Sequence, residues 1–330
     1  MNRARITIAI PTFNRVETIQ ANIASIIGGL PSWVEILICD NASEPAVEFD
    51  PEIWATAEAK GVRMRVHRNP ANVGAPANIL RLFELVETEW LLLLGDDDPL
   101  LPEQLDSIAE CVARHPESAI FKFSSPYGQY EAETVARNFV ELMEKGGDFN
   151  HLLFMSTYLY NVRECRPYLR YGYLMALAAA TQLAIAIMAS LEGKQIVLSP
   201  LLITRARRAE AAWSPADVRL NFYHLTDLPL TPQHRRLLRA KIYAAHNIFR
   251  EFLDIASVHA SQPAEAAYIR QKAMNVHRVH GHGFKRWVAR LLLLLGRITG
   301  PRLLGGFKVL YVRAKGQAYQ HVFTSRHDRL

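Results

Sequence analysis

Short apolar runs alternate with longer amphipathic stretches through the first 125 residues of the chain. The runs are rich in β-branched and aliphatic residues, as strands are, whereas the stretches between them repeat apolar residues at helical spacing. Strands that alternate with helices form a largely parallel sheet covered on both faces. We therefore predict an α/β fold, with strands at residues 6–10, 34–39, 64–67, 90–94 and 119–123 and helices at residues 16–27, 75–86 and 102–115.

Beyond residue 125 the pattern is weaker and becomes helical towards the end. We expect a buried helix over residues 174–192, because polar residues interrupt an apolar run that is otherwise as long as a membrane span. A strand is expected at residues 196–203. From Leu230 onward the sequence predicts helices, with Pro232, Pro263 and Pro301 as boundaries.

Charge is distributed unevenly along the chain. Residues 1–200 carry 16 Lys and Arg against 25 Asp and Glu, whereas residues 201–330 carry 22 against 7, so the two parts have net charges of −9 and +15. From Lys272 onward there are twelve basic residues and one acidic residue, Asp328. Such a segment should bind a polyanion, either nucleic acid or an anionic membrane surface.

The cysteines and the first residues indicate the compartment. Cys39, Cys111 and Cys165 are widely spaced and form neither a CxxC pair nor a zinc-ligand pattern. The opening MNRARITIAIPTFNR lacks the long apolar stretch and cleavage site of a signal peptide. We therefore expect a cytoplasmic protein.

Polar clusters follow three predicted strands: PTFNR at residues 11–15, DNAS at residues 40–43 and GDDD at residues 95–98. In parallel sheets, ligands bind at the carboxyl ends of the strands. Three adjacent carboxylates after a buried strand repel one another unless a cation joins them. If strand geometry continues, the side chains of Asp96 and Asp98 face one way and that of Asp97 faces the other. Asp96 and Asp98 would then form an oxygen site for Mg²⁺ or Mn²⁺ that also holds a diphosphate.

Four segments, IAIPTFNR, EILICDNAS, NPANVGAPANILR and LLLLGDDDPLLPEQL, carry a resemblance over about the first 120 residues. In them the chain resembles glycosyltransferases of family 2, which have the GT-A fold. Within that family it most resembles bacterial enzymes that build O-antigen and other surface polysaccharides, including the abequosyltransferase-like branch. The resemblance implies a GT-A domain at residues 1–228, with a nucleotide-binding half at 1–124 and an acceptor half at 125–228, and a basic helical region at 229–330.

The resemblance also implies a role for each matching motif position. Asp96 and Asp98 match the DxD element that contacts ribose and the Mn²⁺ or Mg²⁺ ion bridging the diphosphate. Asp40 would meet the base, and a carboxylate accepts the imide N–H of uracil or thymine, so a UDP- or dTDP-sugar is favoured over a CDP-sugar while guanine stays open. The other positions implied for the nucleotide site are Pro11, Thr12, Phe13, Arg15, Asn41, Asn72, Gly74, Asn78, Arg81 and Asp97.

The sequence departs from the family at the general base. An inverting transfer needs a group that takes the proton of the acceptor hydroxyl, but Thr181 and Gln182 stand where the family has an acidic pair. Three explanations are open. Glu164, Asp217 or His224 supplies the base, the correspondence is shifted along the chain, or the chain binds a nucleotide sugar with impaired transfer.

The basic tail contains an amphipathic helix pattern beginning at Phe284. Arg286, Arg290 and Arg297 fall opposite an apolar face, which is typical of a helix lying in a membrane interface; the alternative is a helix that packs this face on the catalytic domain. The apolar face comprises Phe284, Trp287, Val288, Leu291, Leu294, Leu295 and Ile298.

Nucleic acid is not expected as a partner, because no nucleic-acid-binding motif is present. We therefore expect a metal-dependent, inverting enzyme on the inner face of the cell membrane, with a glycan or lipid-linked acceptor.

Overall fold

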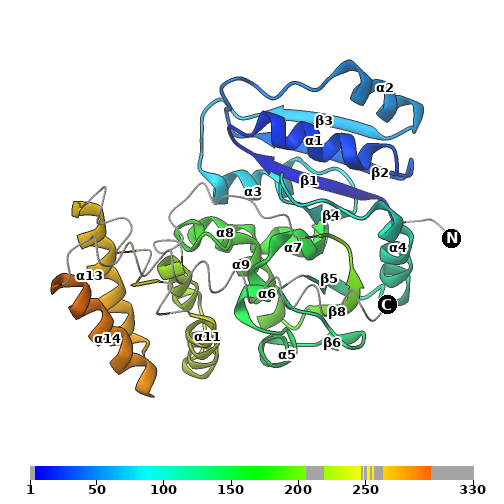
Figure 1. Cartoon of the computed structure of the whole chain (residues 1–330). Helices are drawn as coiled ribbons and strands as arrows, with labels where there is room; N and C mark the ends of the chain where they lie inside the picture. The colour runs from blue at the N-terminus through cyan, green and yellow to red at the C-terminus, as the bar shows by residue number, and fades with distance from the viewer. Residues whose placement is uncertain are drawn as a thin grey trace, which may run out of the picture. The chain divides into compact units, whose positions relative to one another are not determined.

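The computed structural model describes residues 4–125, 127–205, 219–246, 248, 251–252, 255, 263–281 and 283–298. Within this part of the chain, one eight-stranded sheet has the order β3-β2-β1-β4-β7-β5-β8-β6 (Figure 1). Strands β7 and β6 run antiparallel to their neighbours and the remaining pairs are parallel, which confirms the predicted mixed, mostly parallel sheet. The strands are β1 (Ile6–Thr12), β2 (Val34–Asp40), β3 (Arg63–Arg68), β4 (Trp90–Leu93), β5 (Ser118–Ser124), β6 (Thr134–Ala136), β7 (Tyr158–Asn161) and β8 (Gln195–Leu202).

Helices flank the sheet, and the predicted ones are present near the expected bounds. Helix α2 was not expected, because its short amphipathic pattern buries only Ile53 and Ala57. The helices of the first 125 residues are α1 (Val16–Ile27), α2 (Pro51–Ala59), α3 (Ala75–Leu85), η1 (Pro102–Gln104) and α4 (Leu105–Arg114). The later ones are α5 (Phe139–Lys145), α6 (Phe149–Leu153), η2 (Met155–Thr157), α7 (Val162–Cys165), η3 (Arg166–Tyr168), α8 (Leu169–Leu174), η4 (Ala176–Ala178), α9 (Thr181–Leu191) and η5 (Phe222–Asp227), followed by α11 (Pro232–Ala245), α13 (Pro263–Val279) and α14 (Gly283–Ile298).

The single helix predicted over residues 174–192 is wrong in its first part. The chain forms α8 and η4 there, and α9 begins only at Thr181. Ala179 has a left-handed backbone (φ +50°), which an α-helix cannot contain and which separates η4 from α9. Helix α9 is buried almost throughout, as expected of its apolar sequence.

Apolar side chains fill both faces of the sheet. On one face, Ile8 and Leu92 belong to a cluster that includes Ile23 of α1 and Ile108 of α4. On the other face α3 packs against β1 and β2, and its Phe83 contacts the ring of Tyr160 with centroids 5.1 Å apart. Burial on both faces explains why these strands are almost uniformly apolar rather than alternating.

Strand β7 was not predicted from the sequence. Its register pairs Leu92 with Leu159 and Trp90 with Asn161, so β7 begins at the edge where β4 ends. The aromatic run FMSTYLY contains both η2 and most of β7, and periodicity alone does not divide them. As a result, η2 lies at the carboxyl edge of the parallel strands.

The chain forms two compact units, residues 1–210 with 224–245 and residues 211–223 with 246–330. This division differs from the predicted boundary at residue 228, because α11 packs on α5 and α6, and Lys241 donates to the carbonyl of Met143. Helices α11 and α13 begin at Pro232 and Pro263, as predicted. Pro301 lies outside the described residues. Among the described helices, none combines the length and the apolar character needed to cross a bilayer.

Candidate active site

The carboxyl ends of four adjacent strands bring the predicted polar clusters together. In register, Thr12 of β1 pairs with Asp40 of β2, and Asp40 pairs with Arg68 of β3. The hydroxyl of Thr12 donates to the carboxylate of Asp96, just beyond β4, at 2.8 Å. The three motifs therefore meet at one edge of the sheet.

The three aspartates do not alternate as a strand would place them. Strand β4 ends at Leu93, and the N–H of Asp98 donates to the carbonyl of Gly95 to close a turn. The Arg15 guanidinium contacts Asp96 at 2.6 Å and Asp97 at 2.8 Å, whereas Asp98 accepts from the hydroxyl of Ser156. The cation that these carboxylates require is thus partly supplied by the chain itself.

Burial raises the pKa of two of these carboxyl groups. Desolvation raises the pKa of Asp98 to about 6, against the hydrogen bond from Ser156, and the nearby charges of Asp97 and Asp96 add to the rise. Desolvation also raises the pKa of Asp96, although Arg15 and Thr12 oppose it. Positive charge added at this edge would stabilise both ionised side chains.

Two residues that were not predicted hold the aspartate turn in place. Asn22 of α1 donates its amide to the carbonyls of Asp96 and Asp98, both at 3.2 Å. Ser156 of η2 accepts from the N–H of Gly95 at 2.8 Å. An asparagine on the buried, isoleucine-rich face of α1 was a signal that the sequence offered, whereas Ser156 carried none.

Gly95 itself is required by space. A Cβ atom there would lie 2.7 Å from Oδ2 of Asp98 and 3.3 Å from the hydroxyl of Ser156. Any side chain would push the carboxylate of Asp98 out of its position. The glycine therefore lets the backbone approach the oxygen atoms at this edge closely.

Asp40 organises the loop that follows β2. Its carboxylate accepts from the N–H of Ser43 at 2.9 Å, from the N–H of Val47 at 3.4 Å and from Arg68. Burial by itself would raise the pKa of Asp40, but these hydrogen bonds outweigh it and lower the pKa. Asp40 is consequently a buried anion beside the loop, and Arg68 is its partner that the sequence did not identify.

A chain of asparagine amides connects the end of β2 to α3. Asn41 donates to Asn72 at 2.7 Å and accepts from Asn69 at 3.0 Å, and Asn69 also donates to Asn78 at 2.8 Å. Gly74, with φ +81°, completes the turn before α3 in a conformation that favours glycine. The predicted residues Asn41, Asn72, Gly74 and Asn78 are thus brought together.

The other predicted nucleotide-site residues differ in their surroundings. Pro11 and Phe13 stand on either side of Thr12, where β1 ends, and Phe13 is partly exposed there. Arg81 forms an ion pair with Glu84 on the surface of α3. The structure therefore gives Arg81 a local partner on its own helix.

Of the three candidate bases, Glu164 is not brought to this edge. Glu164 follows Asn161, which pairs with the first residue of β4, so it lies towards the opposite edge of the sheet, where Lys194 pairs with it at 2.6 Å. His224 pairs with Asp227 at 3.4 Å. Asp217 lies outside the described residues.

Thr181 and Gln182 are buried at the start of α9 and make structural hydrogen bonds. Thr181 donates to the carbonyl of Pro76 at 3.5 Å, and Gln182 donates to the carbonyl of Leu153 at 2.9 Å. Their side chains link α9 to α3 and α6. Neither side chain accepts a proton at neutral pH.

A buried lysine braces the segment that carries Ser156. Lys122 of β5 is fully buried, donates to the carbonyl of Phe154 at 3.2 Å and contacts the hydroxyl of Thr157. Burial lowers the pKa of Lys122 well below its usual range. Lys122 thus holds the segment from Phe154 to Thr157, whose Ser156 contacts the aspartate turn.

The fold and the carboxyl-edge site have counterparts among known proteins. Residues 7–171, half of the chain, match Glycosyl transferase family 2, and the chain belongs to this family. An uncharacterized glycosyltransferase of Haemophilus influenzae is 25% identical over 111 residues, which cover 34% of this chain and 35% of that protein. The chain thus matches about a third of that relative's length. The predicted family is confirmed.

Solved structures support the same fold. S. aureus TarS 1–349 in complex with UDP-GlcNAc has a TM-score of 0.56 and 15% identity, covering 84% of this chain and 81% of its own. The mannosyltransferase PcManGT of Pyrobaculum calidifontis in complex with GDP-Man and Mn²⁺ has a TM-score of 0.53 and 12% identity, covering 90% and 87%. The predicted GT-A fold is confirmed.

We expect Ser156→Ala to destabilise the protein by about 1–3 kcal/mol, because the buried N–H of Gly95 loses its acceptor and Asp98 loses a donor. Denaturant unfolding measures the change. Ser25→Ala, on the exposed side of α1, is the control and should stay within about 0.5 kcal/mol of the parent. Equal stability of the two variants would contradict the role given to Ser156.

Proposed function

We propose that the chain transfers a sugar from a nucleotide-sugar donor to a glycan or lipid-linked acceptor of surface polysaccharide synthesis, with inversion at the sugar. The observation that carries the proposal is the carboxylate cluster after β4, where Arg15 contacts Asp96 and Asp97. Thr12 and the asparagine chain then surround a donor at the same edge. The narrower placement in the abequosyltransferase-like branch rests on the resemblance of the motifs alone.

Asp96 and Asp98 fit a divalent metal ion. Their oxygens are hard donors of the kind that Mg²⁺ and Mn²⁺ prefer, and burial raises the pKa of both groups, so that a bound cation would relieve the desolvated charge. The lack of a side chain at Gly95 leaves room for the Oδ2 atom of Asp98. When bound, the ion would stabilise the negative charge that develops on the leaving diphosphate. Arg15 would bind a phosphate oxygen from the other side.

Asp40 supports a UDP- or dTDP-sugar as the donor. The side chain is an anion at the end of β2, and an anion accepts the imide N–H of uracil or thymine, which cytosine lacks. TarS binds UDP-GlcNAc and PcManGT binds GDP-Man, so both uracil and guanine donors occur on this fold. Guanine also has a ring N–H and remains the alternative base.

A second candidate function is nucleotide-sugar binding with impaired transfer. It is favoured by Thr181 and Gln182, which stand in place of an acidic pair and are engaged in structural hydrogen bonds. Mass spectrometry of a donor incubated with the protein, Mn²⁺ and lipid-linked glycans separates the two functions. Appearance of a glycosylated acceptor supports transfer, and donor binding without any product supports the second candidate.

Helix α14 supports membrane association. Three residues of its predicted apolar face, Phe284, Trp287 and Leu291, are 77%, 61% and 40% accessible. Among the residues of α14 whose side chains are described, Ala289 and Leu293 are buried; they lie on the other side of the helix, and α14 packs on α13. An exposed Trp-containing arc with arginines opposite is the pattern of an interfacial helix.

We expect Asp98→Asn to reduce Mn²⁺-dependent binding of nucleoside diphosphate at least tenfold, because a neutral amide is a weaker ligand than a carboxylate. The protein should keep or gain stability, since a desolvated charge is removed. Calorimetric titration and thermal unfolding measure both effects, with Glu103→Gln on exposed η1 as the control. Unchanged metal-dependent binding would contradict the assignment of Asp98.

We expect UDP and dTDP to bind about tenfold more tightly than CDP, since one hydrogen bond to a charged group contributes about 1.5 kcal/mol. Asp40→Asn should bring this ratio close to one. Arg68→Gln removes the same ion pair but keeps the carboxylate, so it should preserve the ratio. A general loosening of the loop would weaken the binding of all three nucleotides and would leave this ratio of affinities unchanged. Equal affinities of the parent protein for UDP, dTDP and CDP would contradict the role of Asp40.

We expect the full chain to sediment with vesicles that contain phosphatidylglycerol, less with neutral vesicles and less again at high salt. Trp287→Asp should weaken binding through the apolar arc, and Arg286→Glu with Arg290→Glu should weaken it through charge, by roughly 1 kcal/mol per arginine near the surface. Trp54→Asp, an exposed tryptophan on α2, is the matched control. Unaltered binding of the Trp287 variant would exclude α14 as the anchor.

A further inference from the structure

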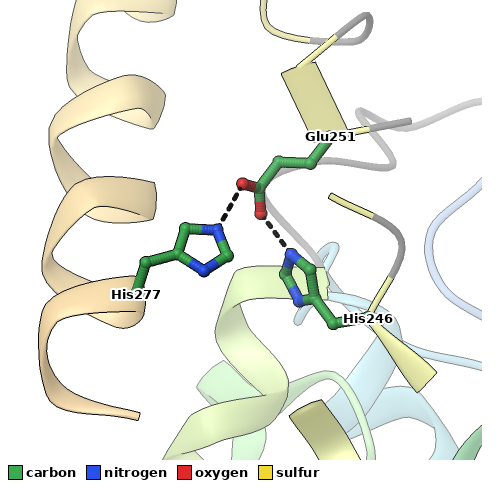
Figure 2. Close-up of side chains that lie close together, drawn as sticks. All are labelled: His246, Glu251 and His277. Atoms are coloured by element: carbon green, nitrogen blue, oxygen red, sulfur yellow. Dashed lines mark hydrogen bonds and ion pairs between the residues drawn. The ribbon is translucent and has the colours of Figure 1, made fainter. Parts of the chain in front are cut away.

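The second unit contains a buried cluster that the glycosyltransferase site does not use. His246 follows α11, Glu251 comes five residues later, and His277 lies in the last turn of α13. Figure 2 shows both imidazole rings directed at the carboxylate, each at a different oxygen. The Nε2 atom of His246 lies 2.5 Å from one carboxylate oxygen, and that of His277 lies 2.9 Å from the other.

The cluster is removed from solvent. His246 is 6% exposed, and Glu251 and His277 are 0% exposed. A carboxylate in the interior is costly unless donors or a cation surround it, and both imidazoles contact this one.

Two imidazole nitrogens and one carboxylate oxygen form a recognised donor set for transition metals. Zinc binds His₂Glu in this way and completes a four-coordinate site with water, and the same donors also suit Co²⁺ and Fe²⁺. The softer imidazole donors make Mg²⁺ and Ca²⁺ poor candidates, since these ions prefer oxygen.

The distances are compatible with an ion. The candidate ligand atoms all lie within 4.8 Å of one another. Bonds of about 2.0–2.1 Å in a tetrahedral arrangement separate ligand atoms by roughly 3.3 Å. The two imidazoles contact different carboxylate oxygens, so binding through one oxygen requires the shorter separations to open by less than about 1 Å and those of up to 4.8 Å to close by up to about 1.5 Å.

We propose that His246, Glu251 and His277 bind a divalent transition-metal ion, with zinc as the first choice. The ion takes the place of the shared protons between the imidazoles and the carboxylate. It joins the segment after α11 to the last turn of α13, and 26 residues separate Glu251 from His277 along the chain. A metal link across such a separation stabilises the folded unit by the binding free energy of the ion.

The test uses the full chain without a histidine tag, stripped of metal and then equilibrated with Zn²⁺ or Co²⁺. Because the aspartates of the first unit also offer carboxylate ligands, the Asp98→Asn variant serves as the parent protein. We expect about one equivalent of Zn²⁺, visible absorption bands typical of four-coordinate Co²⁺, and a thermal midpoint several degrees higher with metal than with chelator.

Glu251→Gln and His277→Gln should lower the bound metal at least tenfold and remove the effect of chelator on the thermal midpoint. His115→Gln, which alters a histidine–carboxylate pair in the first unit, is the matched control and should bind as the parent does. If the parent binds no stoichiometric Zn²⁺ or Co²⁺, the cluster is a metal-free hydrogen-bond network and the proposal fails. That result comes from the parent alone, so it stands even where a variant does not fold.

Discussion

The electrostatics of the aspartate turn after β4 determine how the rest of the first unit is arranged. Carboxylates at the end of a buried strand are costly unless donors and cations surround them. The structure meets that requirement with Arg15 and Thr12 from the end of β1, and with Ser156 from η2. These donors come from two stretches that are far apart in the sequence. The edge of the sheet is therefore assembled around the negative charge.

Strand order makes this assembly possible. Parallel strands β1, β2 and β4 deliver their following residues to one edge, which is why the PTFNR, DNAS and GDDD segments lie together. The reversed strand β7 then brings the beginning of its own segment to that edge, rather than its end. Residues before and after β7 consequently lie at opposite edges of the sheet. Ser156 reaches the aspartates, whereas Glu164 lies towards the far edge and pairs with Lys194.

The sequence predicted what depends on local pattern and missed what depends on partners. Strand and helix positions in the first 125 residues follow from periodicity, and the motif positions follow from the strand ends. Arg68 and Ser156 could not be found in this way, because an arginine ending a strand and a serine in an aromatic run are unremarkable until the sheet pairs them with Asp40 and Asp98. The exposed arc of α14 agrees with the helical-wheel pattern, since Ala289 and Leu293 on the other side supply the packing.

Ser156 has one further consequence, which concerns communication between the two halves of the first unit. Its hydroxyl donates to Asp98 and accepts from the N–H of Gly95, and the next residue, Thr157, contacts Lys122 of β5. A ligand that draws Asp98 away from Ser156 alters the hydrogen bonding of the whole η2 segment. Thermodynamic linkage is reciprocal, so a ligand that reorders η2 from the other side must change affinity at the aspartates by the same factor. Ser156 would then couple the affinities of two ligands that bind on either side of it.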